Sequence, residues 1–69
     1  MPNLELRYLT VNMAWAFVFG EQLVRLQPRE GHVDNRLLFP TREWAVKAAQ
    51  ACGLAVKADG TVIINPNAA

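Results

Sequence analysis

AWAFVFGEQL, residues 14–23, decides the fold of this chain. Three large aromatic side chains alternate there with smaller apolar ones, and this period of two is typical of a β-strand. They are Trp15, Phe17 and Phe19. The strand is expected from Met13 to Phe19, because that stretch contains neither glycine nor proline. Gly20-Glu21 follows and predicts a two-residue turn with glycine at the position that needs a positive φ.

The turn leads the chain back along the aromatic strand, over Gln22 to Leu26, and fixes a pairing register. The predicted pairs are Phe19 with Gln22, Phe17 with Val24 and Trp15 with Leu26. The other face of this hairpin carries Ala14, Ala16, Val18, Leu23 and Arg25. Because the aromatic strand is apolar on both faces, it is expected to be a central strand with both faces covered.

Further strands are expected on either side of the hairpin. Apolar and charged residues alternate from Leu4 to Tyr8, which predicts a strand before it. Asp59-Gly60 lies between two apolar runs and predicts a type I′ turn with a positive φ at both residues. The short apolar segment Leu37–Phe39, which Pro40 closes, is interpreted as one more strand.

One helix is predicted from Arg42 to Cys52. Thr41 has a side chain suited to the N-cap, and Gly53 suits the position just after the last turn. The apolar side of this helix consists mostly of alanine, so the helix is able to approach the surface it packs on closely.

The order of elements is therefore β-β-β-(β)-α-β-β, with the segment at Leu37–Phe39 in parentheses. One helix against an antiparallel sheet makes a two-layer α+β domain. Residues 1–69 are interpreted as a single small domain, with residues 27–35 as a polar loop and residues 65–69 as a frayed tail. The pattern does not decide which face of the sheet the helix covers.

Length and composition exclude several classes of protein. A chain of 69 residues buries only about 60% of the surface that its unfolded form exposes. One cysteine excludes an intrachain disulfide, and one histidine leaves a structural zinc site without ligands. The net charge of +1 gives little attraction to nucleic acid or to acidic membranes. With no long apolar run and no signal-peptide pattern, a cytoplasmic protein that does not bind membranes is expected.

Residues that could carry catalysis are isolated from one another. His32 is predicted in the exposed polar loop, and Cys52 at the end of the helix where the dipole does not stabilise a thiolate. The six carboxylates are scattered and form no catalytic or phosphate-binding motif. The sequence therefore predicts no catalytic residue, no cofactor and no metal, and the chain is not expected to be an enzyme.

The aromatic strand is the feature most suited to function. The expected role is that of a small interaction or accessory module, in which a second copy of the chain or another protein covers the apolar sheet. The candidate interface consists of Trp15, Phe17, Val18, Phe19 and Leu23. The alternative is a nucleic-acid-binding domain, in which bases stack on Trp15 and Phe17. Its candidate phosphate contacts are Arg7, Arg25 and Arg36.

The segments WAFVFG and LLFPTREWAVKAAQACGL resemble small bacterial domains of unknown function. In those domains a Trp-containing hairpin precedes a helix that begins with an F-x-T-x-x-x-A pattern and ends at glycine. The matching positions here are Trp15, Phe17, Phe39, Thr41, Ala45 and Gly53. The resemblance covers about two thirds of the chain, and it implies a bacterial or phage origin and a fold of sheet plus helix. It carries over no catalytic residue.

Overall fold

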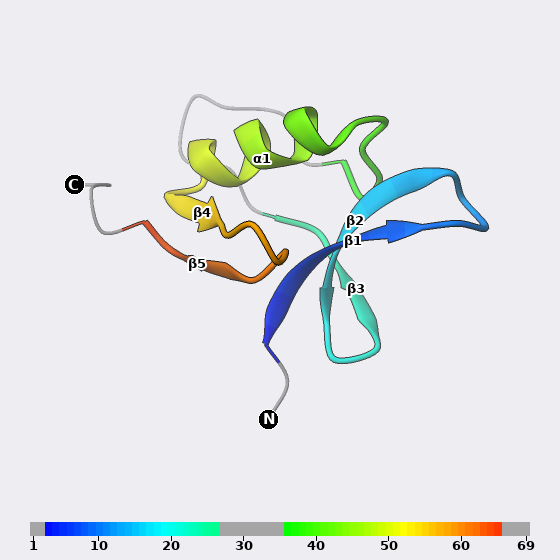
Figure 1. The fold of residues 1–69 in the computed structure, drawn as a ribbon, viewed down its shortest axis with the longest axis horizontal. Helices are drawn as coiled ribbons and strands as arrows, with labels where there is room; N and C mark the ends of the chain where they lie inside the picture. The colour runs from blue at the N-terminus through cyan, green and yellow to red at the C-terminus, as the bar shows by residue number, and fades with distance from the viewer. Residues whose placement is uncertain (1–2, 27–35, 66–69) are drawn as a thin grey trace.

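The computed structural model describes residues 3–26 and 36–65 (Figure 1). The predicted loop with His32, and residues 66–69 of the predicted tail, lie outside them. One helix packs on antiparallel strands, which confirms the small α+β fold. The elements are β1 (Leu4–Leu9), β2 (Ala14–Phe19), β3 (Gln22–Val24), α1 (Arg42–Ala51), β4 (Leu54–Val56) and β5 (Val62–Ile64). Within the described ranges, no helix has the length and apolar content that crossing a membrane requires.

Strand β2 is the central strand of a sheet with the order β1-β2-β3. Its pairing with β3 confirms two predicted partners, because Phe17 lies opposite Val24 and Phe19 lies opposite Gln22. Gly20 in the connecting turn has a φ of 66°, as expected. The strand begins one residue later than predicted, since Met13 belongs to the preceding turn with a φ of 51°.

The third predicted pair, Trp15 with Leu26, is wrong. Strand β3 ends at Val24, and Phe39 lies beside Trp15 instead. The Trp15 N–H donates to the Phe39 carbonyl and the Phe39 N–H donates to the Trp15 carbonyl, both at 2.8 Å. The predicted strand at Leu37–Phe39 is thus reduced to one bridge. Leu26 leaves the ladder and its side chain enters the core, where its exposure is 7%.

Strands β4 and β5 form a second ladder, which meets the first one at the edge of β1. Glu5 and Thr61 form an isolated antiparallel bridge, and the Leu6 N–H donates to the Gly60 carbonyl at 2.7 Å. Figure 1 shows the β4–β5 hairpin beside the start of β1, with α1 above β4 and the twisted β1–β2 hairpin extending away. The two ladders therefore form one layer and the helix the other.

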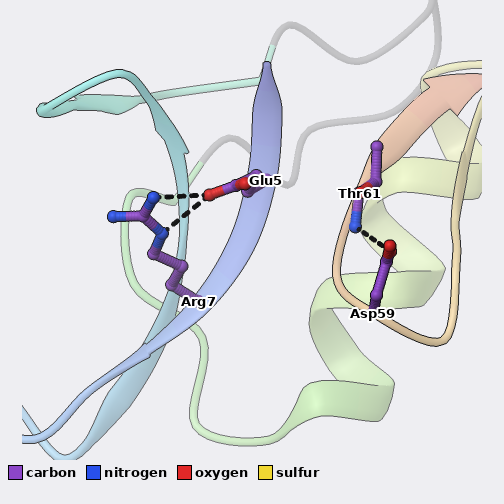
Figure 2. Close-up of polar contacts among 4 residues, drawn as sticks. All are labelled: Glu5, Arg7, Asp59 and Thr61. Carbon is purple, nitrogen blue, oxygen red and sulfur yellow. Dashed lines mark hydrogen bonds and ion pairs between the residues drawn. The ribbon is translucent and has the colours of Figure 1, made fainter. Parts of the chain in front are cut away.

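The turn between β4 and β5 differs from the prediction by one residue. The Gly60 N–H donates to the Lys57 carbonyl at 2.9 Å, so Ala58 and Asp59 are the central residues of the turn. Gly60 has a φ of 94°, whereas Asp59 does not have a positive φ, so that part of the prediction is wrong. This pattern is a three-residue loop with a glycine bulge rather than a two-residue type I′ turn. The Asp59 carboxylate accepts the Thr61 N–H at 2.9 Å (Figure 2).

Helix α1 begins and ends close to the predicted residues. The Thr41 hydroxyl accepts a hydrogen bond from the Trp44 N–H at 3.1 Å, which satisfies one N–H of the first turn. Glu43 lies in that turn, where its negative charge suits the helix dipole. Beyond the last helical residue, Gly53 has a φ of 78° and its N–H donates to the Gln50 carbonyl at 3.0 Å. The predicted cap and the predicted stop are both confirmed.

The core lies between α1 and the aromatic face of β2, which is called the helix-side face below. Phe17 and Phe39 are fully buried there and meet edge to face, with ring centroids 5.6 Å apart. The helix contributes only small side chains to this cluster: Ala45, Ala48 and Ala49. Because alanine is short, α1 lies close enough to the sheet for two large rings to fill the space between the layers.

Candidate interaction surface

The five residues of the predicted interface divide into a buried group and an exposed group. Phe17 is 0% exposed and Val18 is 5% exposed, so neither side chain is available to a partner in this fold. Trp15 is half-buried and packs against the core. Phe19 and Leu23 remain 51% and 44% exposed. Of the five predicted residues, the two with exposed side chains therefore lie on the β2–β3 hairpin.

The face of the sheet opposite α1, called the outer face below, is better covered than the sequence predicts. Val18 and Ala16 lie on it and are buried, although α1 packs on the other face. Their cross-strand neighbours on β1 are Glu5 and Arg7. The Arg7 Nε and Nη2 atoms lie 2.8 and 2.5 Å from the Glu5 carboxylate (Figure 2). Since long side chains shield smaller neighbours with their stems, Val18 needs no second copy for cover.

Hydrogen bonding around Trp15 shows which way the backbone of β3 faces. Trp15 directs both its N–H and its carbonyl to Phe39, on the side of β2 where β3 lies. Backbone direction alternates along a strand, so Phe17 and Phe19 face β3 as well and bond to Val24 and Gln22. The N–H and carbonyl of Leu23 consequently point away from β2.

Strand β3 is an edge strand of its sheet. Within residues 3–26 and 36–65, it pairs with β2 and with no other strand. The side of β3 that faces away from β2, with the outward N–H and carbonyl of Leu23 and the flanking residues Glu21 and Arg25, is called the β3 edge below. An edge of this kind is a template on which another strand is able to pair. The β3 edge and the exposed side chains of Phe19 and Leu23 occur on the same short hairpin.

The three arginines of the nucleic-acid alternative are not gathered around the aromatic strand. Arg7 lies opposite Ala16, on the outer face, whereas Trp15 and Phe17 lie on the helix-side face. Arg36 is elsewhere, with its guanidinium carbon 4.2 Å from the centre of the Trp44 ring at the start of α1. Arg25 is exposed and follows the last residue of β3. Cations and stacking rings therefore do not share one face of β2.

The sequence did not predict the exposed apolar tip of the β1–β2 hairpin. Val11 is 95% exposed and Met13 is 76% exposed, in a turn closed by the Asn12 N–H and the Leu9 carbonyl at 3.2 Å. The alternation of apolar residues predicts Met13 in a strand. Its positive φ could not be predicted, because methionine rarely adopts that conformation and no sequence pattern marks it. Tyr8 and Trp15 lie behind this tip, with ring centroids 5.4 Å apart.

Groups capable of catalysis do not converge in the described residues. Residues 3–26 and 36–65 contain no group of three or more His, Cys, Asp or Glu side chains that could hold a metal ion. Cys52 is the C-cap of α1 and packs half-buried against the core. A shallow hollow of about 240 Å³ on the outer side of α1 is lined by Arg42, Glu43, Val46, Lys47 and Gln50. This set contains no nucleophile paired with a base.

The carboxylate of Asp59 has a shifted pKa. Hydrogen bonds from the backbone N–H and the side chain of Thr61 lower the pKa of Asp59 below its usual value. These bonds stabilise the β4–β5 turn, so the shift has a structural cause and marks no reactive group.

The chain matches no protein-family model, no curated protein and no solved structure. A functional assignment therefore depends on the geometry of the chain itself.

Proposed function

We propose that this chain is a small interaction module that self-associates and has no catalytic activity of its own. The observation that carries the proposal is the exposure of Phe19 and Leu23 beside the β3 edge. The residues of β2 that precede Phe19 are buried or half-buried in the same chain. The β2–β3 hairpin is thus the part of β2 and β3 where apolar side chains remain exposed.

Self-association is favourable because it removes apolar surface and unpaired backbone N–H and carbonyl groups of the β3 edge from water. Each Å² of apolar area that a contact buries contributes about 25 cal/mol, against which the cost of association must be set. A chain of this size has a small core, and self-association is a common way to supplement it. A second copy presents the same apolar side chains and the same strand edge, so the two surfaces are alike in chemistry.

The proposed module is cytoplasmic and binds no cofactor and no membrane. A reducing compartment suits a chain whose single cysteine, Cys52, packs against the core. The resemblance to small bacterial domains, with its implied bacterial or phage origin, belongs to the same proposal. The nucleic-acid alternative has less support, because Arg7 and the aromatic side chains of β2 lie on opposite faces of the sheet.

Sedimentation across a wide concentration range tests the proposal. The weight-average mass of the chain is expected to rise from 7.7 kDa at low micromolar concentration toward twice that value near millimolar concentration. The melting temperature is expected to rise with concentration as well, because mass action stabilises the folded state when only folded chains associate. A constant mass of 7.7 kDa and a constant melting temperature over the whole range contradict self-association.

A matched pair of variants locates the contact. Leu23→Lys places a charge on the β2–β3 hairpin, and we expect it to abolish the concentration dependence without unfolding the chain, since Leu23 is already exposed. Val11→Lys places the same charge on the other hairpin and is expected to associate like the parent. The reverse pattern would move the contact to the β1–β2 hairpin.

A further inference from the structure

We propose that two copies pair through the β3 edge, antiparallel, about a twofold axis at Leu23, with the Glu21 of each copy opposite the Arg25 of the other. This inference depends on the proposed self-association and specifies its geometry. It joins the two three-stranded sheets into one sheet that continues across the axis.

The backbone of β3 has the direction that such pairing needs. The N–H and carbonyl of Leu23 point away from β2, because Gln22 and Val24 are the residues that bond to it. Glu21, in the turn before β3, and Arg25, just after it, flank Leu23 at two residues on either side. An antiparallel second strand centred on Leu23 therefore meets an outward donor and an outward acceptor at that residue, as within a sheet.

Side chains of the β3 edge select the partner and the register. Glu21 and Arg25 are the charged residues two positions before and after Leu23, so pairing about Leu23 brings each Glu21 opposite the Arg25 of the second copy. The two Leu23 side chains, each 44% exposed, then meet at the axis. This arrangement is self-complementary in charge and in hydrophobicity, which argues for a second copy of the chain as the occupant.

Other registers are less favourable. Backbone geometry permits only shifts of two residues, because a shift of one residue would turn the bonding groups of one strand away from the other. A shift in one direction places Leu23 opposite Glu21, and a shift in the other places Leu23 opposite Arg25. Both leave an apolar side chain facing a charged one and separate the two ion pairs.

The guanidinium of Arg25 has donors for more than one acceptor. It carries five N–H groups in a fixed fork, so the Glu21 of a second copy is able to bind without displacing the existing contacts of Arg25 within its own chain. Glu21 and Arg25 are both exposed. Because the edge is short and its ion pairs are solvated, the association is expected to be weak and sensitive to salt.

Charge exchange tests the pairing. Glu21→Arg and Arg25→Glu each replace two attractive contacts with two repulsive ones, and each is expected to weaken the dimer about tenfold. The double variant restores opposite charges across the axis and is expected to recover most of the parent affinity. Glu43→Arg, on the exposed side of α1, makes the same change in net charge as Glu21→Arg and serves as its control, expected to match the parent. Sedimentation gives the dissociation constant of each variant.

Disulfide trapping gives a second, independent readout. In a Cys52→Ala background, Leu23→Cys places two thiols at the axis, where directly paired residues have Cα atoms about 5.5 Å apart and are able to form a disulfide. In the control Gln22→Cys, the two introduced thiols are two residues apart along the paired strands, because each residue 22 lies opposite residue 24 of the second copy. We expect rapid covalent dimerisation of Leu23→Cys and little of Gln22→Cys.

The possible outcomes separate this inference from the function on which it depends. A parent chain that dimerises while the charge variants are unaffected, or while both cysteine variants cross-link equally, overturns the β3 pairing and leaves self-association standing. A parent chain that stays monomeric at all concentrations overturns both. Loss of affinity in each single charge variant with recovery in the double variant, together with selective trapping at Leu23, supports both.

Discussion

The Gly60 carbonyl accepts a hydrogen bond from the Leu6 N–H at 2.7 Å, and this contact joins the two strand ladders of the fold. A Cβ atom at Gly60 would lie 2.8 Å from the carbonyl oxygen of Leu6, which is closer than real Cβ atoms approach. Gly60 also has a φ of 94°, a conformation that other residues rarely adopt. Glycine is therefore required at this position both by its backbone conformation and by its neighbour.

Replacing Gly60 with alanine is expected to destabilise the chain strongly. The unfavourable φ costs about 1–2 kcal/mol, and displacement of the Leu6 backbone adds about 1–3 kcal/mol. Gly20→Ala is the control. Gly20 has a positive φ of 66° at the tip of a hairpin, so alanine there is destabilised by the same unfavourable conformation. Chemical denaturation measures both. Equal losses of unfolding free energy in the two variants would show that the close approach of Gly60 to Leu6 adds nothing to the destabilisation.

Removal of the helix cap is expected to cost about 0.5–2 kcal/mol of unfolding free energy. Thr41→Ala leaves the Trp44 N–H without the hydroxyl that accepts its hydrogen bond at 3.1 Å. Thr41→Ser keeps a hydroxyl at the same position and is expected to remain close to the parent. Urea denaturation of the three proteins provides the comparison, and a Thr41→Ser variant as unstable as Thr41→Ala would contradict the role of the cap.

Stability at low pH is expected to depend on Asp59. Its pKa is lowered in the folded chain by the hydrogen bonds from Thr61, so the contribution of Asp59 to stability is present above its unfolded pKa and disappears as the pH falls through its folded pKa. Asp59→Asn keeps a side-chain oxygen for the Thr61 N–H but does not titrate. The melting temperature of the parent should therefore fall more steeply on acidification than that of the variant. Parallel curves would contradict the assignment.

Replacing Met13 with asparagine is expected to stabilise the chain by up to about 1 kcal/mol, because asparagine tolerates the left-handed conformation better than methionine does. Met13 has a φ of 51° and an exposed side chain, so little packing is lost. Val11→Asn removes an exposed apolar side chain from the same turn and controls for polarity. A Met13→Asn variant that is less stable than the parent would show that the methionine side chain has a structural contact.

The features that sequence predicts well are local. The two-residue turn at Gly20-Glu21 sets the register of β2 and β3, and Thr41 and Gly53 set the ends of α1, because a few neighbouring residues determine each conformation. Asp59-Gly60 correctly predicts a turn between β4 and β5, but the central residues of that turn lie one position earlier than predicted. The reason is that Asp-Gly is compatible both with a type I′ turn and with a glycine bulge. Which one forms depends on the strand pairing outside the turn.

Features that sequence does not predict depend on contacts between distant segments. Phe39 takes the place of Leu26 beside Trp15 because the segment before α1 returns to the edge of β2, which no periodicity reveals. Burial of Val18 depends on its neighbours across the sheet rather than on its own position in the pattern. Of the five predicted interface residues, Phe17 and Val18 are therefore buried in the structure, whereas Phe19 and Leu23 are exposed.

The central claim is that the β3 edge pairs with a second copy, and a dilution series followed by amide NMR spectra tests it most directly. On dilution from about millimolar to low micromolar concentration, we expect the amide signals of Leu23 and Arg25 to shift together along one binding curve. Those of Ala45 in α1 and Val62 in β5, which lie in the core, are predicted to stay fixed. Signals that do not move at any residue, or that move at the β1–β2 hairpin and not at β3, would contradict the account.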